Sequence, residues 1–178
     1  KTTLPDSSSL TYSYDTAHRL IGIKDALGNR IAYTLDKVSN RTKENVFDPA
    51  NVLARTASRV FDTLNRPIKA IGAQGQTTTF AYDGNDNLIQ TTDPLNHVTQ
   101  QAFDALNRLI QTTDAAAGKT KYAYDALDRL TSVTDPKGLA TAYAYDGLDN
   151  QAQTSSPDTG LTTKTYDAAG NVLTATDA

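Results

Sequence analysis

The chain has 178 residues, of which 38% are hydrophobic and only 7% aromatic, with a formal net charge of −3 and no Cys, Met or Trp. The lack of cysteine excludes a disulfide framework, a thiolate metal site and a catalytic thiol. A charged fraction of 21% with both signs in near balance argues against disorder and against nucleic-acid binding, and no apolar run reaches the roughly 18 residues of a membrane-spanning helix.

An aromatic residue followed by aspartate recurs along the chain. The aromatic positions are Tyr14, Phe61, Tyr82, Phe103, Tyr124, Tyr145 and Tyr166, with a constant spacing of 21 residues from Phe61 onward. Leu35 occupies the slot 21 residues after Tyr14, and the next step, to Phe61, is 26, which implies a five-residue insertion within residues 36–60. A fixed period of this length is typical of repeat architectures, so we predict a single array of about seven repeats over residues 1–178. The chain ends partway through a unit, and we expect it to be a fragment of a longer array.

A second polar position follows each aromatic by five residues. It is occupied by Arg19, Asn40, Arg66, Asn87, Arg108, Arg129, Asn150 and Asn171. Two interpretations are open: a donor to the Asp and to turn carbonyls of a neighbouring repeat, which we favour, or a periodic ridge that binds a sugar or an acidic partner. We therefore predict that the aromatic and Arg positions are structural.

Each unit contains the signals of two strands and two turns. Segments rich in β-branched residues at 20–23, 88–92, 109–113 and 130–134 predict the first strand. Turn sequences follow at 25–28, 93–96 and 135–138, where Asp, Pro and Gly or Asn favour a tight reversal. The segment 141–145 then alternates strictly and puts Tyr143 and Tyr145 on one face.

These units predict an all-β fold of tandem antiparallel β-hairpins. Because open twisted sheets rarely exceed about ten strands without bending, the sheet should be curved or spiralling, with tyrosine ladders between neighbouring strands. The hairpin register stays open: Leu130 joins the tyrosine face if Ser132 opposes Thr141, whereas a one-residue slip brings Val133 there. The alternative fold is a parallel β-helix with about 21 residues per coil, which Asp-Pro-x-Gly turns disfavour.

Several segments resemble chemical motifs only in part. Residues 113–120 end in the Gly-Lys-Thr of a phosphate-binding loop but lack its first Gly, and residues 83–87 begin like a calcium loop but have Leu88 in place of the required Gly. The two histidines, His18 and His97, occupy different repeat positions. We therefore predict no catalytic residue, no metal site and no cofactor, and expect that the chain is not an enzyme.

Residues 124–130 (YDALDRL), 82–88 (YDGNDNL) and 166–172 (YDAAGNV) resemble the YD repeats of the Rhs family. Such repeats occur in Rhs proteins, in the B and C components of insecticidal Tc toxins, in wall-associated bacterial toxins and in animal teneurins. The resemblance implies a long β-sheet that spirals into a hollow shell around a C-terminal toxin domain. Residues 135–141 match the family's Asp-Pro-x-Gly-x-x-Gly core motif only partly, and seven repeats are too few to close a shell.

The resemblance implies a structural role, as part of the wall that encapsulates a toxin in a secreted or cell-surface bacterial protein. The expected partners are the rest of the shell and the enclosed toxin, with self-association through exposed sheet edges and with neither nucleic acid nor membrane insertion. The alternative function is a cell-surface module that binds glycans through exposed Tyr and Arg or Asn rows.

Overall fold

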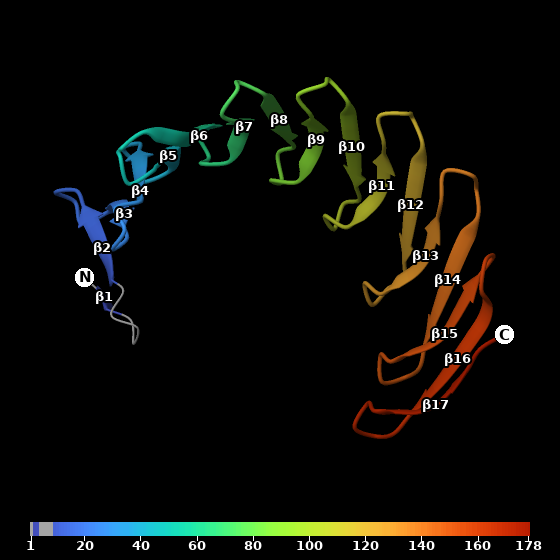
Figure 1. Cartoon of the computed structure of the whole chain (residues 1–178). Helices are drawn as coiled ribbons and strands as arrows, with labels where there is room; N and C mark the ends of the chain where they lie inside the picture. The colour runs from blue at the N-terminus through green and yellow to red at the C-terminus, as the bar shows by residue number, and fades with distance from the viewer. Residues whose placement is uncertain (1, 4–8) are drawn as a thin grey trace. The chain divides into compact units, whose positions relative to one another are not determined.

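The computed structural model describes residues 2–3 and 9–178 as a series of short strands joined by tight turns (Figure 1). Residues 1 and 4–8, which the predicted array includes, lie outside the described residues. The strands are β1 (Thr2–Thr3), β2 (Ser9–Tyr14), β3 (Leu20–Lys24), β4 (Arg30–Leu35), β5 (Arg41–Phe47), β6 (Leu53–Phe61), β7 (Pro67–Ile71), β8 (Thr77–Tyr82), β9 (Leu88–Thr92), β10 (Val98–Phe103), β11 (Leu109–Thr113), β12 (Lys119–Tyr124), β13 (Leu130–Thr134), β14 (Ala140–Tyr145), β15 (Gln151–Ser156), β16 (Gly160–Tyr166) and β17 (Val172–Thr176).

The fold is an all-β, open sheet of antiparallel hairpin repeats, as predicted. The chain divides into two compact units, one formed by residues 1–81 and 91–97 and the other by residues 82–90 and 98–178. In the first unit each strand from β2 to β7 pairs with its successor, and in the second each strand from β10 to β16 does. Every one of these pairings is antiparallel, which excludes the parallel β-helix.

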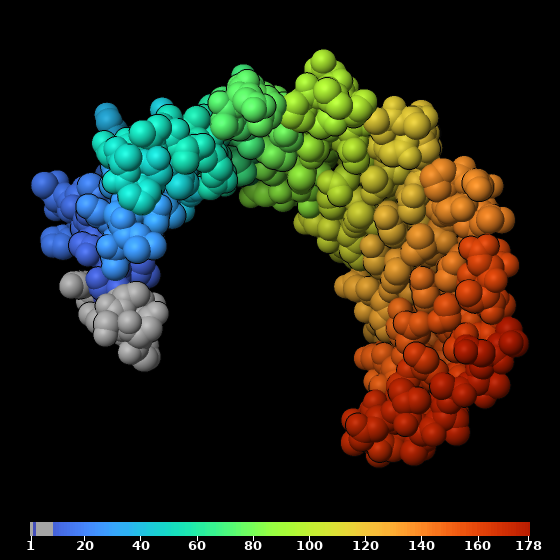
Figure 2. Space-filling view, viewed as in Figure 1, coloured from blue at the N-terminus to red at the C-terminus, as the bar shows by residue number. Residues whose placement is uncertain are grey.

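Neighbours in the sequence remain neighbours in space within each unit. Figure 2 shows each hairpin as its own band of surface, with successive colours side by side. This is the expected behaviour of a repeat protein, in which a unit contacts only the units before and after it.

The register places both Leu130 and Val133 opposite tyrosines. Val133 pairs with Tyr122 on one side and with Thr141 on the other, while a bulge beside Tyr124 brings Leu130 opposite that tyrosine. The structure therefore has the one-residue slip, since Ser132 opposes Ala142 and not Thr141. Leu130 also comes opposite a tyrosine, because the bulge adds one residue to β13. The expected tyrosine ladder between adjacent strands is wrong: Tyr122 and Tyr124 face aliphatic residues on β13, and the next tyrosines lie on β14.

The opposite face of the second unit carries small side chains. Ala123, Ser132, Ala142 and Ser155 lie in one cross-strand row. Among the described residues no hydrophobic side chain is fully buried, so the sheet has no conventional core. Stability must come from the ladder, from half-buried rows on the tyrosine face and from contacts between repeats.

The turns at the two ends of the strands share one backbone geometry. In the β12–β13 turn the N–H of Asp125 donates to Arg129 C=O (3.0 Å) and the N–H of Asp128 donates to Asp125 C=O (3.2 Å). The β13–β14 turn repeats this pattern between Asp135 and Leu139, although its sequence differs. The fourth turn residue has a positive φ, 63° at Asp128 and 86° at Gly138, as in a type I turn closed by a bulge.

The repeat with the 26-residue spacing differs in strand length. Strands β5 and β6 contain 7 and 9 residues, against 5 and 6 in β11 and β12. The additional residues extend the hairpin and leave the turn after Phe61 unchanged, with Asp62 N–H donating to Arg66 C=O at 3.0 Å. Among the described residues there is no helix long and apolar enough to cross a bilayer.

Candidate functional site

The candidate site is the turn that follows each aromatic residue, because the predicted structural positions meet there. Every aromatic in the set Tyr14, Phe61, Tyr82, Phe103, Tyr124, Tyr145 and Tyr166 is the last residue of its strand. Arg19, Arg66, Arg108 and Arg129 each stand immediately before the next strand. We call the Arg or Asn at this position the slot residue, and the positive-φ residue just before it the fourth turn residue.

The aspartate after the aromatic closes its own turn. Asp125 Oδ1 accepts hydrogen bonds from the N–H of Leu127 (2.9 Å) and of Arg129 (3.1 Å), and Oδ2 accepts one from Arg129 Nε (2.7 Å). Asp104 makes the same three bonds at 2.9, 3.0 and 2.7 Å, with Arg108 as its slot residue. A carboxylate is suited to this position because its two oxygens accept several donors at once.

These bonds favour the ionised form of the carboxyl. The backbone N–H of Arg108 lowers the pKa of Asp104 below its ordinary value; desolvation opposes this, and the Arg108 side chain adds to it. The pKa of Asp62 is lowered in the same way by the backbone N–H of Arg66. At Asp146 the amide of Asn150 is the main cause of the lowered pKa. The aspartates are therefore charged acceptors, which is the opposite of what a general acid requires.

Arg19, Arg108 and Arg129 also bond forward to the next repeat. Arg108 Nη1 donates to Asp125 C=O (3.2 Å) and to the carboxylate of Asp128, the fourth turn residue of that repeat (2.7 Å). Arg129 makes the corresponding bonds to Asp146 C=O (3.4 Å) and to Asp149 Oδ1 (2.7 Å). The guanidinium thus connects two successive turns that lie at the same ends of the strands.

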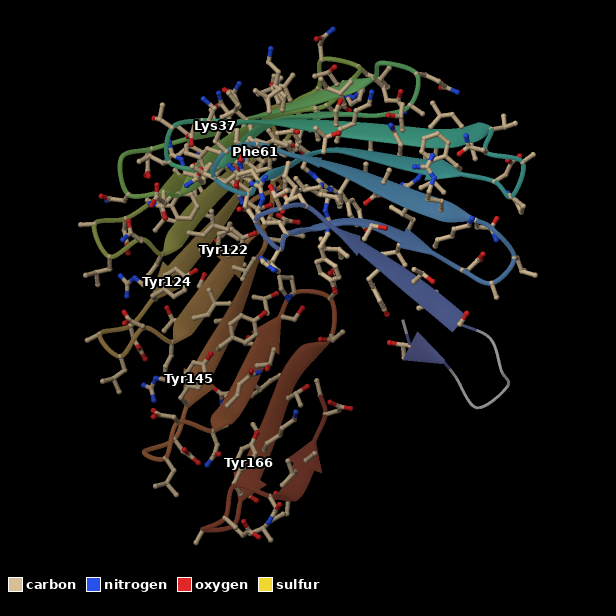
Figure 3. All side chains as sticks on the ribbon, turned by 90° about the vertical axis from the view of Figure 1, so that its left-hand side faces the viewer. Lys37, Phe61, Tyr122, Tyr124, Tyr145 and Tyr166 are labelled. Carbon is tan, nitrogen blue, oxygen red and sulfur yellow. The ribbon has the colours of Figure 1, made fainter. Side chains whose placement is uncertain are left out.

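The aromatic of the next repeat reaches back in the opposite direction. Hydroxyls of Tyr124, Tyr145 and Tyr166 donate to backbone carbonyls 15 residues earlier, at Leu109 (2.9 Å), Leu130 (2.8 Å) and Gln151 (2.8 Å). Figure 3 shows these three tyrosines in file, at the ends of β12, β14 and β16. The Arg108 guanidinium lies 4.9 Å from the centroid of the Tyr124 ring, and Arg129 lies 4.8 Å from that of Tyr145, which adds a cation–π contact.

At two of the slots occupied by asparagine, the amide bonds both its own turn and the next repeat. Asn87 Nδ2 donates to Asp83 Oδ2 (2.9 Å) in its own turn and to Asn107 Oδ1 (2.8 Å), the fourth turn residue of the next repeat. Asn40 bonds Asp36 and Asn65 in the same manner, both at 2.9 Å. The two N–H groups of one amide are used in full.

The extended repeat has two further cation–aromatic pairs beside these contacts. Arg41 lies 3.6 Å from the ring centroid of Tyr33, and Arg30 lies 3.9 Å from that of Phe47. Glu44, opposite Tyr33, accepts a bond from Arg55 Nη2 at 2.6 Å. A groove of about 570 Å³ lies between the turns after Leu35 and Phe61, and its polar lining includes Asn40 and Asn65, which are already bonded to each other.

The segments with partial motif resemblance all form hairpin turns. In residues 113–120 the N–H groups of Ala116 and Gly118 donate to Asp114 Oδ1 (2.9 and 2.8 Å) and are not available to a phosphate. His97 Nδ1 lies 2.9 Å from Asp93 Oδ2, whereas His18 is the fourth turn residue of another turn, with φ 59°. Within residues 2–3 and 9–178 no group of three His, Cys, Asp or Glu side chains is placed to hold a metal ion.

Sequence reasoning missed the importance of the fourth turn residue. The signal was present, because this position holds Asn, Asp, His or Gly in each of the seven turns after an aromatic of the repeat, and these residue types most readily adopt positive φ. It also missed Phe47-Asp48, an aromatic-Asp pair in a turn at the other ends of the strands, where Asp48 N–H donates to Val52 C=O at 3.0 Å. Its spacing differs from the 21-residue period, which concealed it.

The RHS Repeat family model matches residues 1–30, 61–98, 82–119, 103–140 and 124–161 of the chain. The chain belongs to the RHS repeat family. No curated protein matches the RHS chain by sequence.

Several solved structures share the fold of this RHS segment. The crystal structure of TcdB2-TccC3 matches 95% of the chain at 14% identity and a TM-score of 0.68. The crystal structure of TcdB2-TccC3-Cdc42 also matches 95% of the chain, at 13% identity and a TM-score of 0.68. The Tc holotoxin pore of Photorhabdus luminescens matches 94% of the chain at 14% identity, with a TM-score of 0.69. The chain spans 12% of the length of each of these proteins, and at this identity the likeness concerns the fold.

Proposed function

We propose that this RHS segment is wall material: part of a β-sheet shell that encloses a C-terminal toxin domain in a secreted bacterial protein. The observation that carries the proposal is the inter-repeat contact, because Arg108 and Tyr124 connect adjacent hairpins in both directions. Membership in the RHS repeat family and the likeness to TcdB2-TccC3 over 95% of the chain support it.

The physical character of the sheet fits a wall. With no fully buried hydrophobic side chain among the described residues, both faces are accessible, so the sheet can separate two compartments. One face of the second unit carries half-buried tyrosines, and the other carries small residues such as Ala123 and Ser132. Such a surface can extend by adding hairpins, since each repeat needs contacts only with its neighbours.

The alternative is a surface module that binds glycans through its tyrosines. It is the weaker candidate because the hydroxyls of Tyr124, Tyr145 and Tyr166 are engaged by backbone carbonyls and their rings are half buried. The slot residues, too, use their donors within the array.

Limited proteolysis of the full-length gene product tests the proposal. We expect the polypeptide that follows the repeats to resist a protease in the native protein and to become sensitive when Tyr124, Tyr145 and Tyr166 are all replaced by Ala. Equal sensitivity of that polypeptide in both proteins would refute an enclosing role. Binding to a glycan array that is lost in the same Ala variant would favour the alternative.

A further inference from the structure

The fourth turn residue of most repeats is chemically matched to the slot residue of the preceding repeat, which lies 20 positions earlier, or 25 in the extended repeat. Arg108 and Arg129 contact Asp128 and Asp149, whereas Asn40 and Asn87 contact Asn65 and Asn107. Arg66 is likewise followed by Asp86 in the sequence. An Asp after Arg and an Asn after Asn thus recur in five repeats.

We propose that this pair is a recognition surface by which each repeat selects its successor: an Arg slot selects a repeat with Asp at the fourth turn position, and an Asn slot selects one with a neutral residue there. The inference concerns the order of the repeats and does not depend on whether the sheet encloses a toxin.

Charge balance gives the physical reason. In an Arg repeat, one guanidinium faces two carboxylates, those of Asp125 and Asp149 in the case of Arg129. If the slot held Asn, both carboxylates would remain with only a neutral amide between them, and like charges would repel. In an Asn repeat the amide already joins one carboxylate, that of Asp83, to the neutral Asn107, and a second carboxylate there would create the same excess.

The first repeat departs from the scheme, because Arg19 Nη1 lies 3.4 Å from the hydroxyl of Ser39, a neutral acceptor. The Arg19 guanidinium then faces only the carboxylate of Asp15, so no excess of negative charge arises at this pair. Asn150 is followed by Gly170, and a Cβ at Gly170 would lie 3.4 Å from Asn150 Oδ1, which shows that the two positions face each other there as well. No described Asn slot faces an Asp.

Skipping one repeat would present mismatched pairs at most slots. Arg66 would meet Asn107 and Asn87 would meet Asp128, whereas Arg108 with Asp149 would stay matched. Removing one 21-residue unit, or pairing a strand with the wrong hairpin, keeps the hydrophobic alternation and the turn geometry intact, because the regular repeats share them. The slot pair differs between repeats, so it can discriminate between arrangements that backbone pairing cannot.

A double-mutant cycle on the intact chain tests the proposal. The variants are Arg129→Asn, Asp149→Asn and the double variant, which converts an Arg–Asp pair into the Asn–Asn pair of residues 87 and 107. We expect Arg129→Asn to lower the thermal midpoint and to make the amides of β14 and β15 exchange roughly threefold faster, with the double variant recovering at least half of the loss. The cycle cancels the preference of Asn itself for positive φ.

The reverse cycle builds an Arg–Asp pair where the protein has Asn–Asn. Asn107→Asp alone should destabilise the β10–β11 turn, and adding Asn87→Arg should restore it. Asp158→Asn is the control for loss of one charge, because Asp158 is exposed and its side chain bonds no other described residue. The proposal would be overturned if the effect of each double variant equalled the sum of its two single effects. It would also be overturned if Asp158→Asn shifted the thermal midpoint by as much as the coupling between the paired residues does.

Discussion

The tyrosine hydroxyls allow the inter-repeat contact to be tested by removal of a single atom. Tyr145→Phe deletes the bond to Leu130 C=O (2.8 Å) and leaves the ring in place. An intramolecular hydrogen bond contributes a net ~1 kcal/mol to folding, which corresponds to about a fivefold increase in local opening. If the chain melts in one transition, the midpoint should fall by roughly 2–4 °C. Hydrogen exchange of the amides in β13 and β14 measures the local effect directly.

Tyr143→Phe provides a matched control. Tyr143 lies two residues earlier on the same strand and face, pairs with Thr154, and its hydroxyl bonds no other described residue. We expect its replacement to leave exchange in β13 and β14 unchanged. Equal acceleration in both variants would show that the hydroxyl bond has no special role, and so would no acceleration in either.

The turns, the pH dependence and the sheet edge give three further predictions. Ala117 has φ 64°, a conformation unfavourable for alanine, so Ala117→Gly should raise the free energy of unfolding by about 1 kcal/mol in urea denaturation, and an unchanged or lower value would contradict this. Because the folded-state pKa values of Asp15, Asp62 and Asp104 lie below the ordinary 3.8, their stabilisation is present above that pH and lost as the pH falls through the lowered values. Melting curves between pH 2 and 5 should therefore show that the thermal midpoint falls as the pH falls, and that this fall is smaller in Asp104→Asn. Identical pH profiles of the wild type and the variant would refute this assignment. All five residues of β17 are exposed, and the exposed fraction of Leu173 is 65%. Light scattering should therefore detect self-association that rises with concentration and weakens in Leu173→Lys. A monomer at all concentrations would count against this prediction.

Much of the fold could be predicted because the sequence of each repeat contains the signals for its own strands and turns. Alternation around Tyr143, the turn residues 135–138 and the 21-residue period together specify antiparallel hairpins, and the structure confirms them. The residues that face the tyrosines were not predicted correctly, because β13 lies between the tyrosine-bearing strands β12 and β14. The bulge beside Tyr124 also depends on turn geometry that alternation does not encode. One added residue changes which side chains oppose the tyrosine.

The inter-repeat contacts were harder to foresee than the elements. The spacing indicates that Arg108 and its equivalents are donors within the array. It could not reveal that Arg108 Nη1 bonds Asp128. That bond follows only from knowing that residues 20 positions apart lie in adjacent turns at the same ends of the strands. The fourth turn residues were read only as turn formers. Their side chains acquire a partner only when the next hairpin is in register.

Cryo-electron microscopy of the full-length gene product tests the central claim most directly. The account predicts that residues 9–178 form part of a continuous β-sheet wall, with one face toward solvent and the other toward an enclosed volume that contains polypeptide density. A free ribbon with both faces in solvent, or repeats whose strands do not pair in chain order, would contradict it.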